Sequence, residues 1–177
     1  MMGTRSGAID PSIIEFICKE RNLSVSEVTD ILNKESGLKG ICGVNDFRDV
    51  TALAEKGNHN AKLAIKLFEK SIIKYIAQYY FELEGNVDAI VFTAGIGENM
   101  SLIREEIIES ISGAMNIKVN KEANDNIAKF KKYQSGVITT NDSKVDVMVI
   151  PTNEEYMILK DTFELSSKTM NRQQVLK

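Results

Sequence analysis

Residues 87–99 have the sequence VDAIVFTAGIGEN. The first seven of these residues are almost all apolar, which is typical of a strand buried on both faces of a parallel sheet. A turn with two glycines follows, and apolar residues at helical spacing then predict a helix from about Ser101 to Ser112. A strand, a turn and a helix in this order indicate an α/β fold.

The same order of elements returns near the C-terminus. Residues 145–150 (VDVMVI) predict a second buried strand, and after residues 151–155 (PTNEE) we expect a last helix to about Leu165. Upstream, apolar residues at helical spacing predict a helix over 58–84. At 1.5 Å per residue that helix is about 40 Å long, which is long enough to lie across a sheet.

The remaining segments predict further helices and a tail. The expected elements are a helix over 11–21, a helix opened by the capping box Ser24–Glu27, a glycine-punctuated loop over 37–50, a polar helix over 121–132, a short strand at 137–139 and a polar tail over 166–177. We therefore treat residues 1–165 as one α/β portion. Two good strands are too few for an independent sheet, so we expect the rest of the sheet to come from elsewhere and an apolar face to be left bare.

Composition excludes several classes of protein. The chain has 177 residues, of which 43% are hydrophobic, enough to bury a core. With 22 basic and 25 acidic residues, it lacks the positive surface that nucleic-acid binding requires. No stretch approaches the ~20 apolar residues of a membrane span, and Cys18 and Cys42 lack the spacing of a metal site. We expect a cytoplasmic protein without nucleic-acid or membrane partners.

Two candidate ligand loops follow the predicted strands, because α/β sheets bind ligands at the carboxyl ends of their strands. Residues Gly95, Ile96, Gly97, Glu98 and Asn99 combine glycines with a helix start, which suits the phosphates of a nucleotide or is simply a tight turn. Glu154 either helps to hold Mg²⁺ beside a phosphate chain or stabilises the first turn of a helix.

Two further candidates lie in the N-terminal third. Asp46, Phe47 and Arg48 would suit a base and a ribose, through stacking and a hydrogen bond to a hydroxyl, although taken alone this segment favours a solvated ion pair in a loop. Arg5, between two glycines, is the type of cation that stabilises a transferring phosphoryl group, or it is an ordinary surface residue.

Taken together, these motifs resemble the C-terminal half of acetate kinases. The matching segments, in order and with similar spacing, are GTRSGAIDP at 3–11, DFRD at 46–49, VDAIVFTAGIGEN at 87–99 and VIPTNEE at 149–155. The resemblance extends from residue 3 to about residue 165. It implies a ribonuclease-H-like C-terminal domain of the actin, hexokinase and heat-shock-protein-70 superfamily, with long crossing helices.

The resemblance also implies an activity and site roles. It implies the reversible, Mg²⁺-dependent transfer of the γ-phosphoryl group of ATP to acetate, giving acetyl phosphate and ADP, by a homodimer. In this family the segment matching Gly95–Asn99 holds the phosphates and ribose, and the one matching Asp46–Arg48 surrounds the adenosine. Glu154 would belong to the magnesium shell, and Arg5 would stabilise the phosphoryl group in flight.

Some features depart from the family. Ala94 stands where the family has glycine, at a small cost if its φ is negative, and Ala8 stands where the family has aspartate. The N-terminal domain, which carries most of the acyl pocket, has no counterpart here, so we expect a C-terminal portion that is inactive alone. A non-enzymatic nucleotide-binding or dimerisation remnant, and a propionate or butyrate kinase, are the alternatives.

Overall fold

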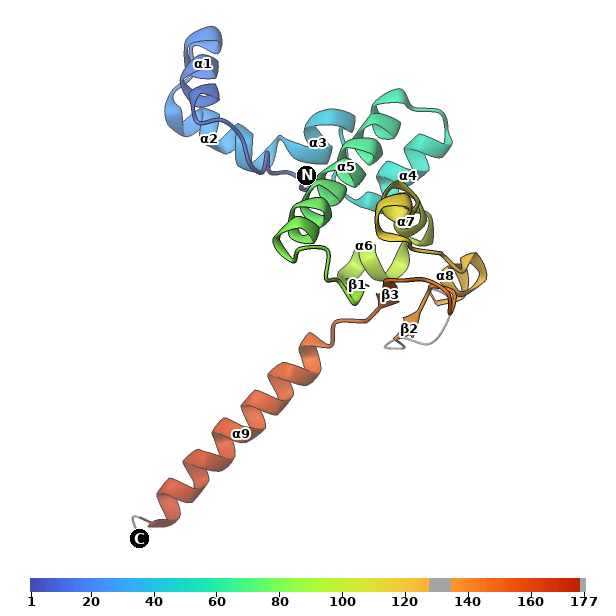
Figure 1. The fold of residues 1–177 in the computed structure, drawn as a ribbon. Coiled ribbons are helices and arrows are strands. Elements are labelled where there is room, and N and C mark those ends of the chain that lie inside the picture. Colours follow the sequence, from blue (N-terminus) through green and yellow to red (C-terminus); the bar gives the residue numbers. More distant parts are fainter. Residues whose placement is uncertain (128–134, 176–177) are drawn as a thin grey trace. The chain divides into compact units, whose positions relative to one another are not determined.

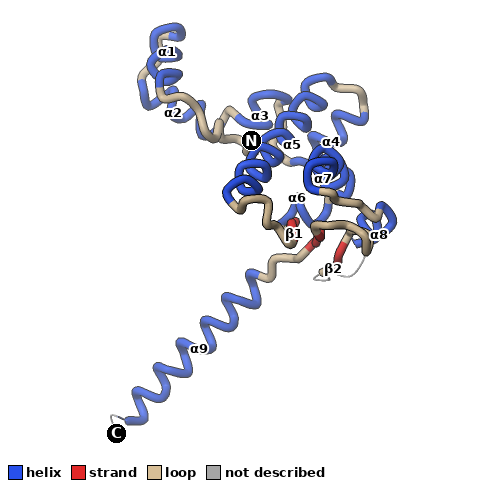
Figure 2. The backbone as a smooth tube through the Cα atoms, viewed as in Figure 1, coloured by secondary structure: helices blue, strands red, loops and turns tan. Residues whose placement is uncertain are grey.

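The computed structural model describes residues 1–127 and 135–175, which divide into two units. The first unit contains Met1–Val87 together with Glu106–Ile111, and the second contains Asp88–Glu105 and the chain from Ser112 on. Helices account for most of the described residues, and the three strands are short (Figure 2).

Helices build the first unit (Figure 1). They are α1 (Ser12–Arg21), α2 (Val25–Lys34), α3 (Gly37–Cys42), α4 (Phe47–Glu55) and α5 (His59–Glu82). The capping box predicted at Ser24 and Glu27 is present, because the Ser24 side chain accepts the Glu27 N–H and the Glu27 carboxylate accepts the Ser24 N–H. The long helix is also confirmed, and it begins where the Asn58 side chain accepts the Ala61 N–H at 2.9 Å.

The loop expected over residues 37–50 is wrong. Helix α3 occupies much of it, and α4 begins at Phe47 because the Asp46 carboxylate accepts the Arg48 N–H at 2.9 Å and caps the helix. The glycines in this stretch allow short helices rather than preventing them. Gly37 has a φ of +61° at the start of α3, and Gly43 has a φ of +84° just after its end.

The second unit contains a small mixed sheet and the helices around it. Its elements are β1 (Ala89–Phe92), α6 (Ala94–Asn99), the two ends of α7 (Ser101–Met115), α8 (Lys121–Ile127), β2 (Gly136–Val137), β3 (Asp146–Val149) and α9 (Glu154–Val175). The strand order is β1–β3–β2. Strands β1 and β3 are parallel, with Phe92 opposite Val149, and β2 is antiparallel to β3. The predicted α/β arrangement of parallel strands is thus confirmed.

Three expectations about this unit need correction. Strand β1 is not buried on both faces: its residues are exposed or half-buried, with Val91 47% exposed, because β1 lies at the sheet edge with β3 as its neighbour. Helix α9 continues past the end expected near Leu165, so residues 166–175 are helical rather than a loose tail. The predicted strand at 137–139 is β2 followed by a bridge from Thr139 to Val119.

The polar helix expected over 121–132 is present as α8 as far as Ile127, and residues 128–132 of that prediction lie outside the described residues. Each unit has its own set of buried apolar side chains. Those of the first unit are Val28, Leu38, Phe47, Val50, Ala61, Ala64, Ile107, Ile108 and Ile111. Those of the second are Ile103, Met115, Ile117, Ile138, Val145, Val147 and Val149. Among the described helices, none combines the length and the apolar character that crossing a bilayer requires.

Candidate functional site

The segment after β1 forms the six-residue helix α6 rather than an open glycine turn. Its entry residue is Ala94, whose φ of +60° lies in the left-handed region, so the negative φ that would make this alanine's cost small is not present. Gly95 and Gly97 lie outside that region. A Cβ atom at Gly97 would lie 3.4 Å from the carbonyl carbon of Phe92, which is about ordinary van der Waals contact.

A buried arginine holds α6 in place. Arg104, on α7, is 0% exposed, and its Nη1 donates to the carbonyl oxygens of Gly97 and Glu98 at 2.8 and 3.0 Å. Its Nε and Nη2 donate to the side-chain and backbone oxygens of Asn124, both at 2.8 Å. Asn124 is also fully buried, and its amide donates to the carbonyl oxygen of Ser101. Burial lowers the pKa of the Arg104 guanidinium, and the nearby Asp125 carboxylate opposes that shift.

Sequence reasoning missed Arg104 and Asn124. The available signal was a cation at a core position of α7, flanked by Ile103 on one side and by Ile107 and Ile108 one turn later. A charged residue is almost never fully buried unless it is paired or hydrogen-bonded. An arginine in an apolar helical stripe therefore indicates a structural or functional network.

The two loops predicted from the strand ends meet in the second unit. Glu98 Oε1 accepts the Thr152 N–H at 2.9 Å and the Thr152 hydroxyl at 3.3 Å, which joins α6 to the segment after β3. The strands continue side by side to this point, because the Ile150 N–H donates to the carbonyl oxygen of Phe92. The rule that α/β ligand loops gather at strand carboxyl ends thus places these two segments together.

Glu154 is exposed in the first turn of α9. The helix start is stabilised by Asn153, whose side chain accepts the Tyr156 N–H at 3.1 Å. A carboxylate in the first turn interacts favourably with the helix dipole, and the exposed position also leaves it in contact with solvent. Both interpretations of Glu154 therefore remain compatible with its position.

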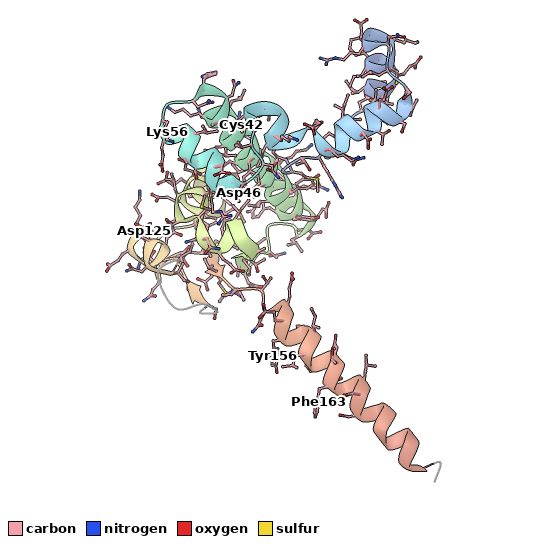
Figure 3. All side chains as sticks on the ribbon, turned by 180° about the vertical axis from the view of Figure 1, so that it is seen from behind. Cys42, Asp46, Lys56, Asp125, Tyr156 and Phe163 are labelled. Carbon is pink, nitrogen blue, oxygen red and sulfur yellow. The ribbon has the colours of Figure 1, made fainter. Side chains whose placement is uncertain are left out.

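Asp46 and Arg48 form a two-pronged ion pair at the start of α4 (Asp46 is labelled in Figure 3). Arg48 Nη2 lies 2.6 Å from one Asp46 oxygen and Nε lies 3.0 Å from the other. These hydrogen bonds lower the pKa of the Asp46 carboxyl to about 2. Phe47, in contrast, is buried, with its ring centroid 4.7 Å from that of Phe68. Its ring supports α4 in the core and presents no open face for stacking.

Arg5 is exposed, on a segment whose backbone is held in place. The Leu38 N–H donates to the Met2 carbonyl oxygen and the Ser36 N–H to that of Thr4, both at 2.9 Å. The close approach requires Gly37, since a Cβ atom there would lie 2.8 Å from the Arg5 carbonyl oxygen. Backbone contacts with the start of α3 thus fix the position from which the Arg5 side chain extends.

The predicted residues fall into both units. Arg5 and Asp46–Arg48 belong to the first unit, while Gly95–Asn99 and Glu154 belong to the second. The structure brings together the members of the second set through Glu98 and Thr152. Within residues 1–127 and 135–175, no three histidine, cysteine, aspartate or glutamate side chains gather closely enough to hold a metal ion by themselves.

Solved structures of carboxylate kinases have the same fold. The crystal structure of Porphyromonas gingivalis acetate kinase matches with a TM-score of 0.82 and 36% identity, over 93% of this chain and 40% of that chain. That of a propionate kinase from Francisella tularensis subsp. tularensis SCHU S4 matches with a TM-score of 0.75 and 44% identity, over 89% of this chain and 38% of that chain. The fold class inferred from the sequence is confirmed.

Sequence comparison defines the family. Residues 1–160 match the model of the acetokinase family. The acetate kinase of Clostridium novyi (strain NT) is 48% identical over 168 residues, which cover 94% of this chain and 40% of that relative. The chain therefore belongs to the acetokinase family, a family of phosphotransferases with a carboxyl group as acceptor. It spans about 40% of the length of the curated relatives that it matches.

Proposed function

We propose that this chain is the nucleotide-binding portion of an acetate kinase, which transfers a phosphoryl group reversibly between ATP and acetate and yields acetyl phosphate and ADP. The observation that carries the proposal is the joining of α6 to the segment after β3 by Glu98 and Thr152, in a chain of the acetokinase family. This arrangement puts a glycine-containing segment and an acidic helix start at the same edge of a sheet.

The residues available suit phosphoryl transfer, which depends on positioning and on cations that face the oxygens of the transferring group. In the proposal, Gly95–Asn99 contact the nucleotide phosphates and ribose, and Arg48 with its partner Asp46 contacts the adenosine. The buried ring of Phe47 acts indirectly, by supporting α4. Arg5 is the proposed cation that stabilises the phosphoryl group in the transition state.

The carboxylate of Glu154 is the type of ligand that Mg²⁺ needs in the proposed site. Mg²⁺ in kinases is usually held by one or two carboxylates, by water and by the phosphates themselves, so a dense cluster of protein ligands is unnecessary. Glu154 supplies an exposed carboxylate next to the segment joined to α6. When bound, the ion would neutralise phosphate charge. ATP or ADP, Mg²⁺, a homodimer and a cytoplasmic location remain predictions that the family implies.

Propionate is the alternative acceptor with an observation in its favour. The Francisella tularensis propionate kinase is 44% identical to this chain in the matched region, about as similar as the acetate kinases are. The matched region therefore does not separate the two acyl groups. We propose acetate because the curated relatives that match at 45% to 49% identity include several acetate kinases.

Calorimetric titration of the purified chain with Mg·ADP tests the nucleotide role. We expect one site per chain and at least tenfold weaker binding in Arg48→Ala. The matched control is Lys34→Ala, which removes another exposed cation from an ion pair of the same unit, and should bind as the parent does. No heat at millimolar Mg·ADP, or equal weakening by both variants, would contradict the proposed nucleotide site.

Reconstitution tests the activity. Because the chain spans about 40% of its relatives, we expect acetyl phosphate formation only when the remaining N-terminal part of the Clostridium novyi relative is supplied as a second polypeptide. Propionate in place of acetate reports the acceptor. A complex that forms and binds Mg·ADP but transfers no phosphoryl group to either acid would favour the non-enzymatic alternative.

A further inference from the structure

We infer that Arg104 is a positioning residue, which holds the proposed nucleotide segment α6 in one conformation and couples it to the segment that carries Glu154. The inference rests on the proposed function for its ligand, a nucleoside diphosphate. Its structural part rests on the hydrogen bonds of a fully buried guanidinium.

Arg104 completes the hydrogen bonding of α6. A helix leaves its last four carbonyl groups without partners, and in a six-residue helix these are most of the helix. In α6 the Ile96 carbonyl oxygen accepts the Met100 N–H at 3.1 Å. The next two carbonyl groups, of Gly97 and Glu98, accept from Arg104. Without the guanidinium, both oxygens would be left to water or unpaired.

Arg104 is itself rigidly held. Its other two donor groups bind the side chain and the backbone of Asn124, which is fully buried on α8. A planar guanidinium fixed at both of its edges has little rotational freedom, and lysine cannot reproduce the fork. The position of α6 is therefore set by α7 and α8 together.

Arg104 also changes the charge around α6. The negative ends of peptide dipoles lie at carbonyl oxygens, and they oppose the approach of a phosphate. Arg104 covers two of these oxygens with a buried cation, whose field is weakly screened compared with that of a surface cation. It therefore makes the environment of α6 more favourable for an anion without contacting the anion.

Glu98 links the two loops. The backbone of Glu98 is bound by Arg104, and its side chain accepts the N–H and the hydroxyl of Thr152. Glu154 follows Thr152 by two residues. A displacement of Glu98 would release Thr152, so one buried arginine controls the relative placement of the proposed phosphate and magnesium segments.

Hydrogen exchange followed by NMR on the full chain tests the structural part, with the Met100 N–H reporting on α6 and the Thr152 N–H reporting on the Glu98 contact. We expect Arg104→Met to speed the exchange of both amides at least tenfold. Arg104→Lys should restore part of the protection, because it keeps the charge and loses the fork. Glu98→Met should speed the exchange of Thr152 alone.

Mg·ADP titration of the same variants tests the functional part. We expect Arg104→Met to weaken binding at least tenfold and Arg104→Lys to recover part of the affinity. The control is Ile108→Val, a buried change on the same helix that lowers stability without touching the network. It should leave the affinity for Mg·ADP within twofold of that of the parent. That result would show that general destabilisation does not account for the weaker binding of Arg104→Met.

Unchanged exchange at Met100 and Thr152 in a folded Arg104→Met variant would overturn the inference. If that variant does not fold, Asn124→Ala and Arg104→Lys decide in the same way, because each releases only part of the network. A parent chain that fails to bind Mg·ADP would remove the proposed function. The exchange data would still decide whether Arg104 positions the two segments.

Discussion

Ala94 has a backbone conformation that glycine adopts more easily. Its φ is +60°, and a residue with a Cβ atom pays roughly 1–2 kcal/mol for the left-handed region. Ala94→Gly should therefore raise the free energy of unfolding, by up to about 1 kcal/mol after allowing for the greater chain entropy of glycine. Urea denaturation measures the change.

The matched control for this substitution is Ala54→Gly, in the regular helix α4. There the same chemical change should lower the free energy of unfolding by about 0.5–1 kcal/mol, because no left-handed strain is relieved. A loss of stability in Ala94→Gly equal to that in Ala54→Gly would show that residue 94 is not strained.

The ion pair of Asp46 and Arg48 predicts a pH dependence. Asp46 has a pKa of about 2, below the ~3.9 of an unperturbed aspartate, so its contribution to stability is present above pH ~4 and is lost as the pH falls towards 2. In Arg48→Ala the pKa should rise but stay below the unperturbed value, because the N–H of residue 48 still donates to the Asp46 carboxylate. NMR titration of the carboxyl carbon measures both. An Asp46 pKa near 4 in the parent chain would contradict the bidentate pair.

At the scale of elements, the start of α3 depends on Gly37. This glycine has a φ of +61°, and a Cβ atom there would collide with the carbonyl groups of Met2 and Arg5. Gly37→Ala should cost more than the roughly 1–2 kcal/mol of the left-handed conformation, because the N-terminal segment must also move. Gly57→Ala is the control, since Gly57 has a φ of +89° and open space around it.

Unfolding in urea compares the two alanine variants, and exchange of the Leu38 N–H, which donates to Met2, reports whether the N-terminal segment has moved. We expect faster exchange in Gly37→Ala only. Equal destabilisation by the two substitutions would mean that the close approach contributes nothing, and that Arg5 is not placed by α3.

Helix α5 carries a buried carboxyl group. Glu69 is 8% exposed, its Oε1 has no hydrogen-bond partner among the described residues, and burial together with a hydrogen bond to Glu106 raises its pKa to about 8. The Lys66 ammonium acts in the opposite direction. The folded state therefore favours the protonated Glu69 carboxyl. Protonation contributes fully to the free energy of unfolding below pH ~4, and this contribution is lost as the pH rises towards 8.

Glu69→Gln should consequently stabilise the chain at pH 8, by on the order of 1–3 kcal/mol, and have little effect at pH 4. Thermal unfolding at the two pH values measures this difference. Glu82→Gln, on an exposed position of the same helix, should show no such dependence on pH. A stabilisation that is the same at both pH values would indicate that Glu69 does not titrate between them.

For the molecule as a whole, the sequence predicts patterns that depend on local spacing. The period of α5 and the capping box at Ser24 follow from such patterns, and the parallel pairing of β1 with β3 follows from the alternation of strands and helices. Tertiary partners decide the rest. The buried Phe47 depends on Phe68, which is distant in the sequence, and the exposed Val91 depends on the edge position of its strand.

The candidate site divides in the same way. The strand-end rule identifies both segments that Glu98 and Thr152 join, because the carboxyl ends of parallel strands must be neighbours. Arg104 was missed because its role requires Asn124, which is 20 residues away on another helix. Hydrophobic periodicity alone gives no role to a polar residue on a buried helix face. Here Arg104 donates hydrogen bonds to the carbonyl groups of α6, a helix that is too short to pair them itself.

Apolar side chains are exposed on opposite faces of α9. Tyr156, Leu159 and Phe163 lie on one face by helical spacing, and Ile158 and Leu165 lie on the opposite one, with exposures from 57% to 70% (Tyr156 and Phe163 are labelled in Figure 3). A helix that is apolar on several sides is normally buried. The matching relatives are more than twice as long as this chain, so the part of the family's polypeptide that is absent here is the expected cover.

This expectation predicts a difference between the chain alone and its complex. Leu159→Ser with Phe163→Ser should leave the free energy of unfolding of the isolated chain almost unchanged, because both side chains are exposed there. The same pair should weaken binding of the N-terminal part of the Clostridium novyi relative at least tenfold, since each buried apolar side chain contributes about 1.5–3 kcal/mol. Sedimentation velocity measures the complex, with Lys160→Ser as the control on the same helix. A complex that forms equally well with the double variant would mean that α9 is not covered by the rest of the enzyme.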